Sequence, residues 1–265
     1  MSRISQQFAQ LKTDGRKALV AYIVNGDPVR EVTLPTMHKM VEEGVDVIEL
    51  GVPFSDPMAE GPVIQKGHER ALEHHVSLTD SLALVAEFRQ TNQHTPVLLM
   101  GYANPVERMG YANFAAKAAE AGVDGLLTVD LPLEEVESLN RELSSHDIDN
   151  IFLLAPTTRV ERARKIAEHA SGFLYYVSLK GVTGAGHLDV ESVQAKLEEF
   201  GALTDLPMCV GFGIKDAASA VKVARLADGV VVGSVLVEAM GQGSEQAPER
   251  VGAIVRDIRQ ALDQI

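Results

Sequence analysis

A chain of 265 residues is long enough to bury a substantial core, as one large domain or two small ones. Its formal net charge of −13 argues against nucleic acid or an anionic membrane as a partner, although backbone amides can still bind a small anion. The single cysteine, Cys209, excludes an intrachain disulfide. No apolar run could span a bilayer and the first residues lack a signal-peptide pattern, so we expect a cytoplasmic protein. The eight histidines show no metal-ligand spacing, so we expect no metal site.

Short apolar runs alternate with amphipathic segments along the chain. Residues 1–13 predict a helix, because Ile4, Phe8 and Leu11 recur at helical spacing. Apolar runs that end in turns rich in Gly, Pro, Asn or Asp predict buried strands at 18–24, 45–50, 96–100, 125–129, 150–154, 173–177, 207–210 and 229–232. Amphipathic spacing predicts helices that end near 43, lie within 62–91 and 112–121, and include 136–143, 190–200, 235–240 and 251–262.

The predicted strands carry apolar residues on both faces, which is typical of a parallel sheet covered by helices on both sides. Regular alternation of strand and helix, without a linker or a shift in composition, favours a single (β/α)8 TIM barrel over residues 1–265 with an extra N-terminal helix. A doubly wound dinucleotide-binding sheet would need Gly-x-Gly-x-x-Gly after the first strand, and Asn25-Gly26-Asp27-Pro28 is not that motif.

The second predicted strand carries an acid, Glu49. Because alternate side chains of a strand share a face, Glu49 points the same way as Val47 and Gly51. A carboxylate inside such a strand must be paired, neutralised or used in chemistry. The loop that follows carries a second acid, Glu60, before a Gly-Pro pair. Two carboxyl groups in different environments suit acid–base catalysis; the alternative is a salt-bridged structural acid and a solvated loop acid.

Glycine-rich segments follow the last three strands. In a barrel of this kind, the loops after strands seven and eight form the usual phosphate site. Gly211-Phe212-Gly213 and Gly233-Ser234 follow those strands, and the second pair precedes a short helix whose N-terminus favours an anion. The loop at 180–186 is either a mobile lid over the site or a flexible crossing.

Other polar and apolar residues at the strand ends complete the predicted site. Asp27, Asn104 and Asp130 precede prolines or helices, so we expect them to act as turn or capping residues. The residues expected to line an apolar cavity, or else to fill the barrel, are Tyr22, Met100, Leu127, Val129, Leu153, Tyr175 and Phe212. An apolar floor, a phosphate anchor and two carboxyl groups suit a flat apolar group joined to a phosphate, with acid–base chemistry that needs no cofactor.

Over essentially its full length the chain resembles the tryptophan synthase alpha chain family. The most specific match is Glu-Leu-Gly-Val-Pro-Phe-Ser-Asp-Pro-Met-Ala-Glu-Gly-Pro at 49–62. The other matching motifs are Ile64-Gln65, Asn104-Pro105, Asp130-Leu131-Pro132, Tyr175-Tyr176-Val177-Ser178, Gly181-Val182-Thr183-Gly184, Gly211-Phe212-Gly213 and Gly233-Ser234.

The resemblance implies a lyase that cleaves indole-3-glycerol phosphate to indole and glyceraldehyde 3-phosphate by a retro-aldol reaction. Glu49 matches the general acid–base of the family, and Tyr175 matches a residue that supports it. Glu60 stands where the family usually has aspartate, the group that interacts with the indole N–H; its side chain is one methylene longer, and we expect the loop to compensate. The resemblance also assigns substrate or phosphate binding to Gly184, Phe212, Gly213, Gly233 and Ser234, and the lid contact with the second carboxylate to Thr183.

The resemblance further implies a partner, the pyridoxal-phosphate-dependent β chain, in an αββα assembly that passes indole through a tunnel. Pyridoxal phosphate would belong to that partner, with no cofactor in this chain. Two other functions stay open: a weakly catalytic barrel that mainly activates the β chain, which the longer Glu60 would suit, and a stand-alone lyase that releases indole. The residues implied for the docking face are Asp56, Pro57, Asn104 and Pro132.

Overall fold

The computed structural model describes residues 2–177, 190–211 and 213–265. All of its strands belong to one parallel sheet with the order β5-β4-β3-β2-β1-β9-β8-β7-β6. The strands are β1 (Ala18–Val24), β2 (Val47–Gly51), β3 (Val97–Gly101), β4 (Gly125–Thr128), β5 (Asp149–Asn150), β6 (Phe152–Leu154), β7 (Leu174–Val177), β8 (Met208–Gly211) and β9 (Gly229–Val232).

The strand expected at 150–154 is interrupted at Ile151, which separates β5 from β6. The amide of Ile151 still donates to the carbonyl of Leu126 at 2.9 Å, and the amide of Ser171 donates to the carbonyl of Asn150 at 3.0 Å. These bonds join β4 to the segment that leads into β7, so the two short strands occupy one position in the barrel. The predicted (β/α)8 barrel is therefore confirmed, with its fifth strand broken.

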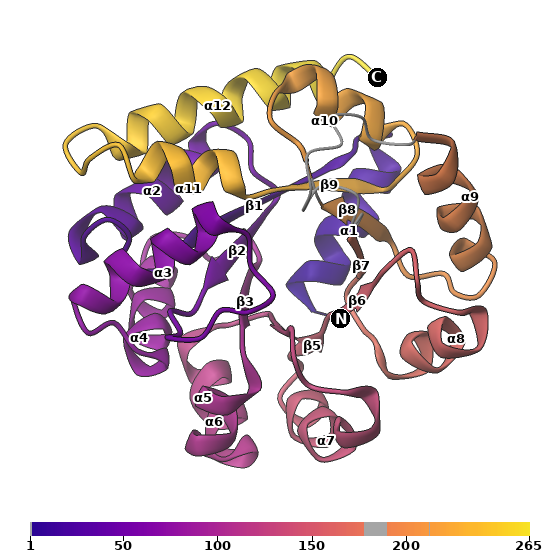
Figure 1. The fold of residues 1–265 in the computed structure, drawn as a ribbon, viewed down its shortest axis with the longest axis horizontal. Coiled ribbons are helices and arrows are strands. Elements are labelled where there is room, and N and C mark those ends of the chain that lie inside the picture. The colour runs from indigo at the N-terminus through magenta and orange to yellow at the C-terminus, as the bar shows by residue number, and fades with distance from the viewer. Residues whose placement is uncertain (1, 178–189, 212) are drawn as a thin grey trace.

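The helices other than α1 (Arg3–Thr13) form a ring around the strands, and α1 lies across the middle of the view in Figure 1. The helices of the ring are α2 (Arg30–Glu42), α3 (Pro62–Glu73), α4 (Leu78–Arg89), α5 (Ala103–Met109), α6 (Tyr111–Ala121), α7 (Glu137–Ser145), α8 (Val160–His169), α9 (Val190–Gly201), α10 (Ala217–Ala224), α11 (Ser234–Met240) and α12 (Ala247–Leu262), with a 3₁₀ turn η1 at Leu133–Glu135. The helix α5 is not predicted by the sequence, because a turn is expected after the strand at 96–100, and α5 begins at Ala103. Pro105 is tolerated there because the first turn of a helix needs no intrahelical N–H bond.

Alternation along the strands divides the apolar side chains into two layers. Val47 packs inside the barrel with Val20 and Leu98. Ile48 and Leu50 face the other way, into the larger core between the sheet and the helices. Glu49 shares the inner face with Val47, as the sequence predicts, so the barrel interior receives a carboxyl group.

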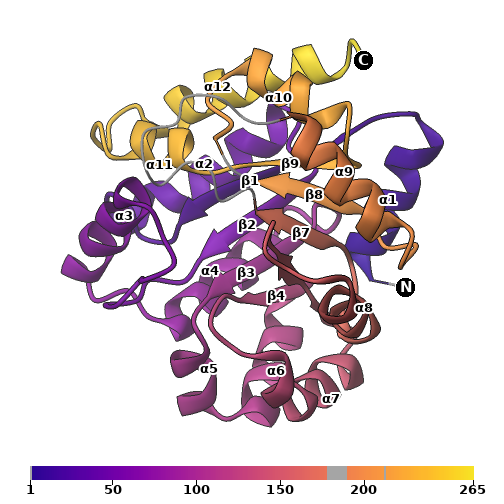
Figure 2. The same ribbon diagram turned by 45° about the vertical axis from the view of Figure 1, so that its right-hand side comes forward.

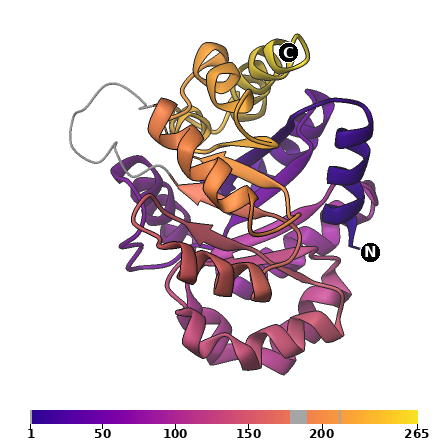
Figure 3. The same cartoon turned by 90° about the vertical axis from the view of Figure 1, so that its right-hand side faces the viewer.

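The N-terminal helix α1 closes one end of the barrel. Ile4, Phe8 and Leu11 are buried in the inner layer, and the Phe8 and Phe173 rings lie 5.5 Å apart. Arg3 pairs with Asp124, which stands just before β4, so α1 lies at the N-terminal ends of the strands (Figure 3). The predicted extra helix is confirmed, and it leaves the opposite, C-terminal end for the site.

Candidate active site

Glu49 lies on β2 inside the barrel and is 1% exposed. Both of its carboxyl oxygens are buried without a hydrogen-bond partner in the described part of the chain. Burial raises the pKa of Glu49 to about 8, and the charge of Glu60 adds to the increase. The group is therefore mostly protonated at neutral pH, and its proton has no hydrogen-bond acceptor among the residues the structure describes, which is the state a general acid requires.

Glu60 lies on the loop between β2 and α3. Its amide donates to the carbonyl of Pro57 at 3.0 Å, and its carbonyl accepts from Gln65 Nε2 at 2.8 Å, so both neighbouring turns fix its backbone. Burial raises the pKa of Glu60 to about 7. The two acids thus have different pKa values, with Glu60 the more easily ionised, as different roles in acid–base chemistry require.

Two tyrosines flank the acids, of which Tyr22 is buried and Tyr175 is half-buried. Tyr22 on β1 is the register partner of Glu49, and Tyr175 comes from β7. Burial raises the pKa of both phenols well above 10, and the charges of Glu49 and Glu60 add to the increase in each case. The four groups therefore share one site.

Each tyrosine hydroxyl lies over a glycine at the end of the strand next to its own, because β2 adjoins β1 and β8 adjoins β7. A Cβ atom at Gly51 would collide with the Tyr22 hydroxyl, and one at Gly211 would collide with the Tyr175 hydroxyl. The missing side chains of β2 and β8 therefore make room for the phenols at the C-terminal end of the barrel.

Three further residues belong to the site, and the sequence analysis did not assign them. His68 on α3 lies 3.2 Å from the Tyr22 hydroxyl through Nε2, and its Nδ1 accepts from the amide of Phe54 at 3.1 Å. The hydroxyl of Tyr102 accepts from the amide of Ala59 at 3.1 Å. The rings of Phe54 and Tyr102 stack with centroids 4.9 Å apart. These contacts attach the Glu60 loop to β1, β3 and α3. In the sequence, the only feature that could have indicated these residues is a histidine on the helix directly after the acid-bearing loop.

Part of the predicted phosphate site lies within the described residues. Gly213 has φ +69°, a conformation that favours glycine, just after β8. Gly233 directly follows β9, and Ser234 is the first residue of α11. These residues stand at neighbouring strand ends, as predicted. Thr183, Gly184 and Phe212, with the expected lid at 180–186, lie outside the described residues.

The predicted partner face surrounds the Glu60 loop. Asp56, Asn104 and Pro132 are exposed, and Pro57 is half-buried. Hydrogen bonds link the loops that carry them, because Ala59 bonds to Tyr102 and the amide of Ala103 donates to Asp130 Oδ1 at 2.7 Å. That last bond confirms the capping role of Asp130, since it satisfies the first amide of α5.

Asp27 lies in the turn after β1, as expected, and its amide donates to the carbonyl of Val24 at 3.3 Å, but its side chain does not cap the following helix α2. Its carboxylate is fully buried and makes a two-pronged ion pair with Arg70 of α3, with contacts of 2.6 and 2.8 Å. A buried carboxylate is retained where a guanidinium satisfies both oxygens. The pair joins the end of β1 to α3, the helix that carries His68.

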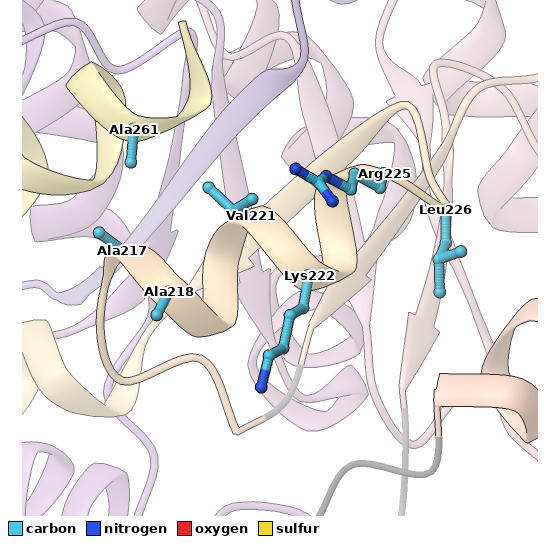
Figure 4. A pocket seen from close by; sticks show the side chains of 7 residues that line it. All are labelled: Ala217, Ala218, Val221, Lys222, Arg225, Leu226 and Ala261. Carbon is cyan, nitrogen blue, oxygen red and sulfur yellow. The ribbon is translucent and has the colours of Figure 1, made fainter. Parts of the chain in front are cut away.

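Other candidate binding features lie away from these residues. A hollow between α10 and α12 is lined by Val221, Lys222 and Ala261 among others (Figure 4), and it contains none of the predicted site residues. No cluster of His, Cys, Asp or Glu among the described residues is arranged to hold a metal ion. Of the helices in the described ranges, none is both long and apolar enough to cross a bilayer.

Fold and site together define a (β/α)8-barrel protein with one buried and one half-buried carboxyl group at the catalytic end of the barrel. The family model of the tryptophan synthase alpha chain matches residues 8–263. A tryptophan synthase alpha chain from Thioalkalivibrio sulfidiphilus is 57% identical over 267 residues, covering 99% of this chain and 100% of that protein. The chain therefore belongs to the tryptophan synthase alpha chain family, and it is a lyase that cleaves indole-3-glycerol phosphate.

Solved structures agree with this assignment. Tryptophan synthase subunit alpha from Legionella pneumophila superposes with a TM-score of 0.94 at 45% identity, covering 100% of both chains. A chain of the tryptophan synthase complex from Pyrococcus furiosus gives a TM-score of 0.83 at 35% identity, covering 92% of this chain and 98% of that one.

Proposed function

We propose that Glu49 is the acid–base group of the lyase reaction. In its protonated form it delivers a proton to C3 of the indole ring. The resulting carboxylate then accepts the proton of the adjacent chain hydroxyl, while the C–C bond breaks and its electron pair returns to the ring. The products are indole and an aldehyde, glyceraldehyde 3-phosphate, and Glu49 regains its proton. The observation that carries the proposal is the complete burial of this carboxyl group with both oxygens lacking a partner among the described residues.

Glu60 is the second carboxylate of the proposed mechanism. Protonation at C3 places positive charge on the indole nitrogen, and a carboxylate at its N–H stabilises that charge. A pKa near 7, raised by burial, leaves a large fraction of Glu60 ionised at neutral pH. Its backbone bonds to Pro57 and Gln65 support a loop geometry set for the longer glutamate, in place of the aspartate usual in the family.

The remaining assigned residues bind and orient the substrate in this proposal. Tyr175 supports Glu49; burial and then the charge of Glu49 raise the pKa of its phenol, which supports a position near that acid. The phosphate binds just after β8 and β9, through Gly213, Gly233 and Ser234, which is supported by the exposure of Gly213 and Ser234 and by the positive φ of Gly213. Thr183 as lid residue, with Gly184 and Phe212 as substrate contacts, follows from the family resemblance alone.

The chain acts, in our proposal, with a β chain in an αββα assembly in the cytoplasm. The similar chain from Pyrococcus furiosus belongs to a tryptophan synthase complex, and the exposed face around Asp56, Asn104 and Pro132 suits docking. Pyridoxal phosphate would belong to the β chain, because proton transfer by two carboxyl groups needs no cofactor in the barrel. The lone buried thiol of Cys209 is compatible with a reducing compartment.

Substitution of Glu49 by glutamine tests the acid–base assignment, because it keeps the shape of the side chain but removes its proton transfer. We expect release of indole from indole-3-glycerol phosphate to fall by about 10³-fold or more, with the dissociation constant changed only about twofold. The matched control is Glu69→Gln, on the exposed surface of α3, which should leave both values unchanged. Turnover within about tenfold of the unsubstituted chain would rule out this role for Glu49.

The same assay with and without a β chain separates the alternatives. Strong stimulation supports an α subunit with a working Glu60. Equal, high activity in both conditions supports a stand-alone lyase, and binding without turnover in both supports an activating subunit that catalyses poorly.

A further inference from the structure

Strand β1 must underlie the middle of the substrate if its two ends bind as proposed above. The sheet order places β1 between β2, which carries Glu49, and β9, which Gly233 directly follows; the three strands lie side by side in Figure 2. An indole ring at Glu49 and a phosphate at the end of β9 therefore require the three-carbon chain between them to cross β1. The side chain that β1 presents at that level is Tyr22.

The position of Tyr22 fits this crossing. Its backbone is in register with Glu49 on one side, and on the other a Cβ atom placed on Gly233 would lie 3.4 Å from the Tyr22 Cβ. Its side chain is 3% exposed, and its hydroxyl extends over Gly51. Tyr22 thus has its Cβ atom beside the expected phosphate site and its hydroxyl on the side of the two acids, where the chain hydroxyl next to the indole ring would lie.

His68 fixes the direction of the Tyr22 hydroxyl. Nδ1 of His68 accepts the amide proton of Phe54, so this nitrogen carries no proton of its own. Burial lowers the pKa of His68 to about 4, so the ring is neutral and its one proton is on Nε2. Nε2 therefore donates to the Tyr22 oxygen at 3.2 Å, and the phenol keeps its own proton free to donate elsewhere.

The free phenol proton has no protein acceptor in the described part of the chain. The one hydrogen bond of the Tyr22 hydroxyl there is to His68. The titratable groups that face it are Glu60, Glu49, Tyr102 and Tyr175, and neither carboxyl oxygen of Glu49 is hydrogen-bonded within the described residues. A directed donor in a buried site without a protein partner is a group available to a ligand.

We propose that Tyr22 is a specificity-determining residue of the lyase reaction: its hydroxyl donates a hydrogen bond to a hydroxyl of the glycerol chain of indole-3-glycerol phosphate. His68 is the positioning residue that keeps this donor directed at the substrate. The inference rests on the proposed placement of Glu49 and of the phosphate site, and it adds recognition of the chain between them.

The test compares two ligands that differ only in the hydroxyls of the chain. One is indole-3-glycerol phosphate, and the other is indole-3-propanol phosphate, which has neither chain hydroxyl. Their dissociation constants are measured by titration calorimetry with Glu49→Gln, which blocks turnover, and with the double variant Glu49→Gln/Tyr22→Phe. We expect Tyr22→Phe to raise the dissociation constant of indole-3-glycerol phosphate about fivefold, which is the effect of losing one neutral hydrogen bond. The dissociation constant of indole-3-propanol phosphate should rise less than about twofold.

Two further variants identify the source of the effect. Tyr176→Phe removes a buried phenol hydroxyl from the opposite face of β7, where its ring lies 6.2 Å from Phe200, and should change neither constant. His68→Phe should reproduce the selective loss seen with Tyr22→Phe, and the two substitutions together should cause no larger loss than either alone.

Equal losses for both ligands, or no loss for either, would overturn the inference. Failure of the proposed function is seen separately, as indole release by Glu49→Gln. In that case Tyr22→Phe is compared with the otherwise unsubstituted chain, by measuring kcat/KM for the substrate and the inhibition constant of the propanol compound. The inference then requires kcat/KM to fall while the inhibition constant stays nearly unchanged.

Discussion

At the scale of single residues, the two acids differ in how the chain holds them. Glu49 is on a strand and its burial is complete, whereas Glu60 is on a loop whose turns fix the backbone but leave the side chain less enclosed. Desolvation disfavours the charged form of each, and the more deeply buried group also experiences the charge of the other. The pKa order that results, with Glu49 above Glu60, matches an acid beside a charge-stabilising carboxylate.

This order predicts a bell-shaped dependence of kcat/KM on pH. Activity requires Glu60 ionised, so it rises as the pH passes the Glu60 pKa of about 7, and it requires Glu49 protonated, so it falls as the pH passes the Glu49 pKa of about 8. We expect the maximum between these values, with the apparent pKa values belonging to the interacting pair. The measurement is the initial rate of indole release at low substrate concentration.

The variant Glu60→Gln separates the acidic limb from ionisation of the substrate phosphate, whose second pKa is about 6. Its profile should lose the rise near pH 7, keep only a rise near pH 6, and fall on the basic side at a lower pH, because the negative charge beside Glu49 has been removed. A flat profile across both pKa values in the unsubstituted chain would contradict the assigned protonation states.

The predictable part of the site is the part that local patterns reveal. Glu49 was recognisable because a carboxyl group in an apolar strand is costly, and Glu60 because the loop beside it is strongly marked by Gly and Pro. The Tyr22–His68 contact joins residues 46 positions apart. Strand alternation places Tyr22 inside the barrel, but it does not tell which residue of α3 meets it, since that depends on how the helix packs on the sheet.

At the scale of elements, α1 acts as part of the barrel core. Its apolar face was predictable from spacing alone, but its place inside the barrel was not, because amphipathicity only requires an apolar surface to pack against. The interruption at Ile151 and the separate helix α5 were unpredictable for a related reason. Both depend on bonds to neighbouring strands and loops, such as Ile151 to Leu126 and Ala103 to Asp130.

Phe8→Ala tests the role of α1. The ring is 6% exposed and packs against Phe173 inside the barrel, so its removal should lower the free energy of unfolding by roughly 3–5 kcal/mol. Urea denaturation measures this change. Lys12→Ala on the exposed face of the same helix is the control and should shift the value by less than about 0.5 kcal/mol. Because Phe8 lies at the end of the barrel opposite the acids, kcat/KM at low temperature should change less than about twofold. A small loss of stability together with a large loss of activity would contradict a purely stabilising role for α1.

At the scale of the whole molecule, the catalytic end of the barrel and the proposed docking face share one set of loops. The chain from Asp56 to Glu60 is exposed at its start and turns inward at its end, and Ala59 between them is bonded to Tyr102. A partner that contacts Asp56 and Pro57 would therefore act on the backbone that holds Glu60. This connection gives a physical route by which a β chain could stimulate cleavage without reaching the substrate.

Met58 gives the sharpest test of that route. Its side chain is 78% exposed, and among the described residues the only other large hydrophobic side chain that is exposed is Ile265, at 37%. An apolar side chain this exposed on a proposed interface is suited to become buried in a partner. Met58→Lys would place a charge there, and we expect the β-chain concentration for half-maximal stimulation of indole release to rise roughly tenfold. Ile265→Lys is the control: it introduces the same charge away from this loop and should leave the β-chain concentration for half-maximal stimulation unchanged. Equal effects of the two substitutions would mean that the added charge, and not the face around Met58, weakens the association.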